Sequence, residues 1–250
     1  MKWALISGAT AGIGMETAKQ LAAQGYNILA LGRRADRLNK LKTELSKSGR
    51  EVVTAVVDVQ KHSDVDAFAK EHQELLGKLD VLVNNAGLAK GTEKTQDGKI
   101  NDWDVMIDTN VKGLLYLTRS VIPFMLKNKR GHIVNLGSVA GRWVYPGGAV
   151  YCATKFAVRA ISEGLRMDLI GSNIRVSNIE PGMVNTEFSL VRLGSQERAD
   201  SVYANMKPLT AADIAETIGW VLSRPAHVNI QELVIFPTDQ PAVGQVHRRT

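Results

Sequence analysis

A hydroxyl, a phenol and an ammonium group occur in one stretch of this chain, GSVAGRWVYPGGAVYCATK, in the side chains of Ser138, Tyr151 and Lys155. Residues four apart share one face of a helix, so a helix over residues 153–169 lets the Lys155 ammonium reach toward the Tyr151 phenol. A phenol with a cation beside it can pass a proton to or from a substrate oxygen. The spacing therefore predicts an acid-base catalytic site.

The lysine matters because an unperturbed tyrosine, with a pKa near ~10, is a poor base at neutral pH. A unit positive charge about 4 Å away is worth about 4 kcal/mol at an effective dielectric constant of about 20, or roughly three pK units. We therefore expect Lys155 to lower the pKa of Tyr151 into the working range.

Length and composition indicate one α/β domain, because 250 residues can form a large core and no linker or internal repeat divides them. The net charge of +6 comes from Lys and Arg dispersed among acids, which favours a solvated surface over a nucleic-acid site. A single cysteine, Cys152, excludes an internal disulfide, and the five histidines show no metal-ligand spacing. The apolar run at residues 3–6 is too short for a signal peptide, and no run reaches membrane-spanning length, so we expect a cytoplasmic protein.

Short apolar runs alternate with longer amphipathic segments along the chain. The runs predict seven strands, at residues 3–6, 28–31, 52–57, 81–83, 133–136, 174–179 and 233–236. The amphipathic segments predict helices at residues 13–24, 35–48, 63–76, 103–127, 153–169 and 211–223. Because strand-helix alternation is typical of a parallel sheet covered on both faces, we expect a doubly wound Rossmann domain. Its ligands would bind at the carboxyl ends of the strands.

The first predicted strand runs through SGATAGIG directly into a helix. Glycines in such a turn let the backbone approach a pyrophosphate at the helix N-terminus, which makes this a dinucleotide loop. No lysine stands in the loop, which argues against a P-loop. The candidate cofactor residues here are Gly8, Thr10, Ala11, Gly12, Ile13 and Gly14.

The second predicted strand ends in Arg33 and Arg34, where an NAD enzyme would present an acid to the ribose hydroxyls. Guanidinium groups bind phosphate through paired, charge-assisted hydrogen bonds, so the arginines favour the 2′-phosphate of NADP. Asp58 closes the third strand and could accept a hydrogen bond from the adenine. Asn84, Ala86 and Gly87 close the fourth strand at the same edge, although Asp and Asn there are also ordinary turn residues.

Together, SGATAGIG, NNAG, Asn110, Ser138, Tyr151-x-x-x-Lys155 and Pro181-Gly182 resemble the short-chain dehydrogenase/reductase family over residues 1 to about 238. The resemblance implies a Rossmann domain, a nicotinamide cofactor and metal-free hydride transfer, in a homotetramer or homodimer. It also implies cofactor contacts from Tyr151, Lys155, Pro181, Gly182, Val184 and Thr186.

Carried over to this sequence, the family's catalytic roles fall on four residues. Tyr151 would be the general acid-base, and Ser138 would hold the substrate oxygen. Lys155 would bind the nicotinamide ribose, and Asn110 would link Lys155 to a water relay. Within the family, segments such as NNAGLAKG, EPGMVNTEFSLVR and the terminal VHRRT are similar to the NADP-dependent dehydrogenases of 3-hydroxy acids such as L-serine, L-allo-threonine and 3-hydroxyisobutyrate, which also reduce malonic semialdehyde.

A 3-hydroxy acid needs a cation for its carboxylate, and Arg142 and Arg192 are the candidates. We expect the loop at residues 184–207 to close over the substrate. An alternative is a reductase of other ketones or aldehydes, favoured if neither arginine faces the cleft and Trp143, Tyr145 and Phe188 line it instead. A regulator that senses NADP without turnover is a third possibility. The tail, residues 241–250, is either a disordered end or a contact with a neighbouring subunit.

Overall fold

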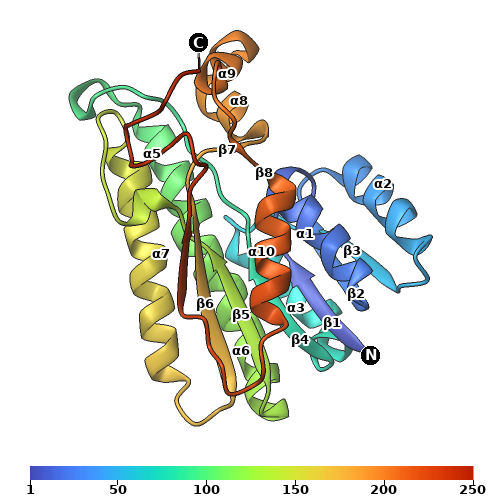
Figure 1. The fold of residues 1–250 in the computed structure, drawn as a ribbon. Coiled ribbons are helices and arrows are strands. Elements are labelled where there is room, and N and C mark those ends of the chain that lie inside the picture. The colour runs from blue at the N-terminus through green and yellow to red at the C-terminus, as the bar shows by residue number, and fades with distance from the viewer. Residues whose placement is uncertain (250) are drawn as a thin grey trace.

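A seven-stranded parallel sheet forms the centre of the computed structural model, which describes residues 1–249 (Figure 1). The predicted strands and their parallel arrangement are confirmed. The strands lie in the order β3-β2-β1-β4-β5-β6-β9. Their bounds are β1 Lys2–Ile6, β2 Tyr26–Gly32, β3 Val52–Val56, β4 Leu79–Asn84, β5 Gly131–Leu136, β6 Ile174–Pro181 and β9 Glu232–Ile235.

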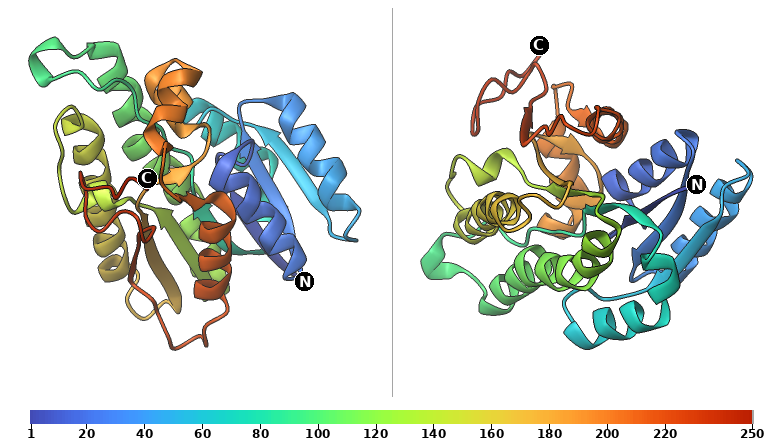
Figure 2. Two further views of the ribbon diagram at one scale, coloured as in Figure 1. Left: turned by 45° about the horizontal axis from the view of Figure 1, so that its top comes forward. Right: turned by 90° about the horizontal axis from the view of Figure 1, so that it is seen from below.

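Helices cover both faces of the sheet because alternate residues of each strand point to opposite sides (Figure 2). Ala4 and Ile6 of β1 belong to one core with α1 Gly12–Ala23, α2 Ala35–Ser46 and α10 Ala211–Leu222. Trp3 and Leu5 belong to the other core, with α3 His62–Glu71, α6 Leu114–Asn128 and the end of α7 Ala149–Asp168. Two short helices lie between these elements: α4 Gln73–Leu76 follows α3, and η1 Thr95–Asp97 follows β4.

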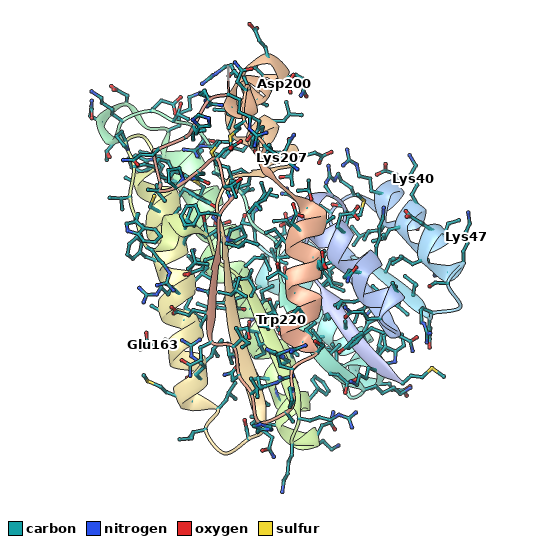
Figure 3. All side chains as sticks on the ribbon, viewed as in Figure 1. Lys40, Lys47, Glu163, Asp200, Lys207 and Trp220 are labelled. Carbon is teal, nitrogen blue, oxygen red and sulfur yellow. The ribbon has the colours of Figure 1, made fainter. Side chains whose placement is uncertain are left out.

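Charged side chains are among those on the outer faces of these helices. Figure 3 shows Lys40 of α2 and Glu163 of α7 directed away from the sheet, and both are exposed. No helix within residues 1–249 combines the length and apolar character needed to cross a membrane.

The strand order reverses next to β1, which has β2 on one side and β4 on the other. Ligands of open parallel sheets bind at such a switch point, outside the carboxyl ends of the strands. The glycine loop follows β1 here, and the NNAG segment follows β4. The fold therefore brings these two motifs to one crevice.

The helix predicted over residues 103–127 is divided in three: α5 Ile100–Ile107, the π-helix η2 Asp108–Gly113, and α6. Pro123 lies inside α6 and not at the division. The apolar periodicity of residues 103–127 predicted one continuous helix and gave no sign of this division. π-helical turns are frequent at functional sites, and η2 contains Asn110.

The segment expected to close over substrate contains two helices and two very short strands: β7 Val184–Asn185, α8 Glu187–Leu193, α9 Gln196–Tyr203 and β8 Leu209–Thr210. In Figure 1, α8 and α9 (orange) lie above the edge of the sheet at which the strands end. We refer to residues 184–207 as the substrate loop.

The tail packs on the substrate loop of its own chain. The Arg249 amide donates to the Asn205 carbonyl at 2.6 Å, and its guanidinium pairs with Asp239 at 2.9 Å. Arg248 donates to the Val202 carbonyl at 3.1 Å. These contacts argue against the expected disordered end, and the expected contact with a neighbouring subunit stays a prediction. Thr250, the last residue of the predicted tail, lies outside the described residues.

Candidate active site

The structure brings Ser138, Tyr151 and Lys155 together. Tyr151 and Lys155 both lie in α7. This helix begins at Ala149, before the predicted start at residue 153, and therefore includes Tyr151. The Tyr151 phenol is buried, and the Ser138 hydroxyl acts to lower its pKa, against the larger effect of burial. The Lys155 ammonium lies 5.9 Å from the centre of the Tyr151 ring and donates to the Leu136 carbonyl at 2.7 Å.

The pKa of Tyr151 is shifted in the direction opposite to our expectation. Burial raises it above its usual value, because the phenolate loses its hydration. Burial also lowers the pKa of Lys155 to about 8, so the ammonium is itself disfavoured in this site. The predicted net lowering of the Tyr151 pKa is therefore wrong for this arrangement, in which burial outweighs the favourable effect of a nearby positive charge.

Ser138 stands at the start of η3 Val139–Gly141, in extended backbone, where its Oγ accepts from the Ala140 amide at 3.1 Å. Gly141 lies so close to the backbone of Lys155 that any Cβ there would clash with the Lys155 carbonyl. The turn after β5 is thus packed directly on α7. This contact fixes the serine relative to the tyrosine and the lysine.

Asn110 joins the π-helix to the loop after β4 and to α7. Its Oδ1 accepts from the Leu88 amide at 2.9 Å, and its Nδ2 donates to the Leu88 carbonyl at 2.8 Å and to Thr154 Oγ1 at 3.0 Å. Thr154 donates in turn to the Tyr151 carbonyl at 2.7 Å. Its contacts are with these neighbours and not with Lys155, so the structure shows a bracing role for Asn110.

The glycine loop has the shape of a cradle. Gly8 and Gly12 have φ values of 67° and 51°, a left-handed conformation that favours glycine. A Cβ on Gly14 would clash with the Gly8 carbonyl, so only glycine lets α1 start this close to the turn. Ala11 precedes the first turn of α1 in extended backbone, and Ile13 packs on the core. The amides at this helix start remain available to an anion.

Ser7 and Asn85 hold the cradle against the end of β4. Ser7 Oγ accepts from the amides of Asn85 and Ala86 at 3.1 and 3.0 Å. Asn85 Nδ2 donates to the carbonyls of Ser7 and Gly8 at 2.9 and 3.2 Å. Asn85 belongs to the NNAG segment expected at this edge, although it was not among the candidate cofactor residues.

Asn84 and Asp58 have local partners. Asn84 is buried between the sheet and α6, where it donates to Thr118 Oγ1 and Asn135 Oδ1, both at 2.8 Å. This places its side chain inside the sheet and away from the crevice. Asp58 accepts from the Gln60 amide at 3.2 Å, which is the turn-forming role that we considered. Gly87 faces Asn110 and Lys155.

The arginines that follow β2 differ in their contacts. Arg33 is exposed, and no hydrogen bond joins its side chain to another of residues 1–249. Arg34 donates through Nε and Nη2 to Thr10 Oγ1 at 3.2 and 3.0 Å, which ties it to the glycine loop. It also pairs with Glu187 of the substrate loop. A phosphate held by Arg33 and Arg34 would lie beside the glycine loop.

Residues 181–186 lead from β6 over the crevice. The Pro181 carbonyl accepts from Ser138 Oγ at 3.5 Å, and Gly182 packs on Phe236 and Pro237. After Val184 in β7, Thr186 approaches to 3.3 Å from the position of a Cβ on Gly12. The start of the substrate loop thus lies against the glycine loop.

Only one of the two candidate substrate arginines faces Tyr151. The guanidinium of Arg192 lies 6.0 Å from the centre of the Tyr151 ring, and Arg192 donates to the Gly91 carbonyl and the Tyr145 hydroxyl at 3.1 and 3.0 Å. Arg142 instead forms ion pairs with Glu180, which is fully buried, and Glu232. Its charge is already compensated there, which leaves Arg192 as the candidate.

A pocket beside Tyr151 is lined by charged and aromatic side chains. Lys90 and Trp103 line it together with Tyr151 and Arg192, and the sequence analysis missed Lys90. Of the aromatic residues in the alternative hypothesis, Phe188 meets the Tyr151 ring edge-on at 5.6 Å. Trp143 is half-exposed and lies against Phe236. Because Arg192 faces the site, the condition that would favour the alternative is not met.

Comparison with known proteins agrees with this site. Residues 2–193 match the family described as short chain dehydrogenase. The chain is 47% identical over 247 residues to the NADP-dependent 3-hydroxy acid dehydrogenase YdfG of Salmonella typhi, with 98% of each chain covered. It is 45% identical over 238 residues to sulfoacetaldehyde reductase 2 of Chromohalobacter salexigens, with 94% of each covered. It is also similar to the closed form of serine dehydrogenase complexed with NADP+, with a TM-score of 0.92, 44% identity, and 99% and 100% of the two chains covered.

Proposed function

Because the chain belongs to the short-chain dehydrogenase family, whose members act on CH–OH groups, we propose that it interconverts small 3-hydroxy acids and their 3-oxo forms with NADP. The observation that carries this proposal is the position of Arg192, a cation facing the acid-base tyrosine. The substrates that we propose are L-serine, L-allo-threonine and 3-hydroxyisobutyrate, with malonic semialdehyde in the direction of reduction.

The residues of the crevice fit NADP. The glycine cradle would admit a pyrophosphate, and a side chain at Gly14 would distort it by pushing α1 away from the Gly8 carbonyl. Arg33 and Arg34 would hold the 2′-phosphate, and Lys155 would bind the nicotinamide ribose. Bound NADP supplies the hydride acceptor in oxidation, and NADPH supplies the hydride donor in reduction.

Tyr151 carries out the proton transfer. In reduction, its protonated phenol donates a proton to the substrate oxygen, while the Ser138 hydroxyl holds the same oxygen by a hydrogen bond. In oxidation, the phenol must first lose its proton, and the Lys155 ammonium then stabilises the phenolate. The raised pKa of Tyr151 suits the donor role, so the site is well prepared for reduction at neutral pH. Asn110, which bonds to Leu88 and Thr154 and not to Lys155, would brace α7 against the loop after β4.

Arg192 would hold the substrate carboxylate by charge-assisted hydrogen bonds. Its Nη1 and Nε are already oriented by Tyr145 and Gly91, so little side-chain freedom would be lost on binding. Lys90 and Lys99 line the same pocket, but Glu93 and Asp102 line it too, so the preference for an anion rests on Arg192 beside Tyr151. An anionic group on a short substrate is therefore favoured over an uncharged one.

A reductase of other aldehydes or ketones is the second candidate. One relative, at 45% identity, is named a sulfoacetaldehyde reductase, and the same arginine could bind a sulfonate in place of a carboxylate. We infer from the complete set of Ser138, Tyr151 and Lys155 that a regulator without turnover is the weakest of the three hypotheses.

The test is to follow NADPH absorbance with each substrate class. NADPH formation from L-serine, L-allo-threonine or 3-hydroxyisobutyrate, lost in Tyr151→Phe, would support the first candidate. NADPH consumption with sulfoacetaldehyde or simple ketones alone would favour the second. NADPH binding without turnover of any of them would favour the regulator.

We also propose a homotetramer or homodimer in the cytoplasm. Its support is that α5, α6 and α7 each expose a large apolar side chain, Ile107, Leu115 and Phe156. Sedimentation equilibrium measures the mass directly, and a monomer at micromolar concentration would contradict this proposal.

A further inference from the structure

Glu187, the first residue of α8, is held between two arginines from the opposite side of the crevice. Its Oε2 accepts from Arg34 at 2.9 Å, and its Oε1 accepts from Arg37 at 2.6 Å. The hydrogen bond from Arg37 lowers the pKa of the Glu187 carboxyl, which is therefore ionised at neutral pH. Arg37, on α2, was not among the residues that the sequence indicated.

These contacts cross the crevice that the cofactor would occupy. Arg34 and Arg37 belong to the segment that follows β2, about 150 residues before Glu187 in the sequence. The neighbour of Glu187, Thr186, lies against Gly12 of the glycine loop. The chain at residues 186–187 thus passes over the cradle and is fastened on its far side.

The donors of Arg34 allow it to serve two partners. Its Nε and Nη2 bond to Thr10, and Nη1 bonds to Glu187, but both Nη groups carry a second hydrogen. A 2′-phosphate can therefore bind Arg34 while Glu187 stays in place. Arg37 has Glu187 as its ion-pair partner within residues 1–249.

We propose that Glu187 is a clasp that holds the substrate loop closed over the cofactor, with Arg37 as its dedicated partner and Arg34 shared with the 2′-phosphate. The proposal rests on the proposed function only in requiring NADP as cofactor. Glu187 is a positioning residue, because it acts through the closed loop. The three side chains are each about 40% exposed, so water can replace these contacts when the loop opens.

A clasp of this kind limits the exchange of the cofactor. Neither NADP nor NADPH could enter or leave the cradle until residues 186–187 lift away from Gly12. Breaking the clasp should therefore speed the release of NADPH. It should do the same for NADH, because the loop covers the cradle whichever nucleotide it holds.

The experiment is stopped-flow displacement of NADPH, followed by its fluorescence, without any substrate. We expect Glu187→Gln and Arg37→Gln each to release NADPH roughly two- to tenfold faster than the unmodified protein. The double variant should be no faster than the faster single variant, because both remove the same contact. Glu197→Gln is the matched control, since Glu197 lies in the first turn of α9 in the same loop and forms no ion pair among residues 1–249.

Two results would overturn the proposal. Unchanged release in Glu187→Gln would show that the contact does not hold the loop. Slower release, confined to NADPH and absent with NADH, would show that Glu187 competes with the 2′-phosphate. Added salt gives a second measurement on the unmodified protein, because it should accelerate release there and have less effect in Glu187→Gln.

The outcomes separate this inference from the proposed function. Failure of the protein to bind NADPH would reject both the clasp and the proposed NADP-dependent function. Faster NADPH release in the variants, without turnover of any hydroxy acid, would support the clasp and reject the proposed substrate. Thermal unfolding of each variant shows that a change in release does not come from a misfolded chain.

Discussion

The guanidinium of Arg192 faces the ring of Tyr151, 6.0 Å from its centre, although the two residues come from different helices, α8 and α7. Tyr151, the proposed acid-base group, and Arg192, the proposed cation for an anionic substrate, line the same pocket. Because α8 belongs to the substrate loop, the position of this loop decides whether the two can act on the same molecule. We propose that this loop couples catalysis to substrate selection.

Replacing Arg192 should weaken substrate binding and leave the cofactor unaffected. In Arg192→Met we expect KM for a 3-hydroxy acid to rise by roughly 10- to 100-fold, because a hydrogen bond to a charged group is worth about 1.5–3 kcal/mol. Steady-state kinetics with NADP and L-serine measure it. Arg198→Gln, an exposed arginine of the same loop, is the control. An unchanged KM would reject Arg192 as the carboxylate ligand.

The two reaction directions should depend differently on pH. The pKa of Tyr151 is raised, so the phenol keeps its proton through neutral and mildly alkaline pH. Reduction uses the protonated phenol, and its rate should stay level over this range. Oxidation uses the phenolate, and its rate should rise with pH throughout. Rates of NADPH consumption and formation against pH check this, and a plateau of the oxidation rate below neutral pH would contradict it.

Arg33 should decide between NADPH and NADH. Its side chain is exposed and forms no hydrogen bond within residues 1–249, so Arg33→Gln should fold normally. Loss of one charge-assisted contact to the 2′-phosphate should lower the affinity for NADPH by roughly tenfold. Fluorescence titration with NADPH and with NADH gives the ratio of the two affinities in the variant and in the unmodified protein. Equal losses for NADPH and NADH would place the phosphate elsewhere.

His132 should make the protein sensitive to acid. It is buried in β5, where burial lowers its pKa to about 3 and Nε2 contacts Ser177 Oγ at 2.8 Å. Below the unfolded pKa of about 6.5, the unfolded chain binds a proton that the folded chain refuses, so the stability contribution is lost as pH falls. The loss between about pH 7 and about pH 5 should be about 2 kcal/mol.

Urea unfolding at the two pH values measures this loss. In His132→Asn the pH dependence should be smaller by about the same amount. An equal pH dependence in the variant and the unmodified protein would assign the acid sensitivity to other groups.

The sequence predicted those parts of the structure that depend on local pattern. The parallel strands follow from short apolar runs, and the pairing of Tyr151 with Lys155 follows from helical spacing. The pKa of Tyr151 could not be predicted in this way, because it depends on burial by segments far apart in the chain. Arg142 shows the same limit, since its carboxylate partners lie 38 and 90 residues away.

The buried contact between Asn84 and Asn135 has a consequence for folding specificity. The two residues are direct partners in the register of β4 against β5, and their amides bond to each other at 2.8 Å. A slip of either strand by one residue would put the two amides on opposite faces of the sheet, and each buried amide would lose its partner. The contact therefore penalises misaligned pairings of the two strands. It selects the one alignment that places the NNAG segment and Ser138 at the same level of the sheet.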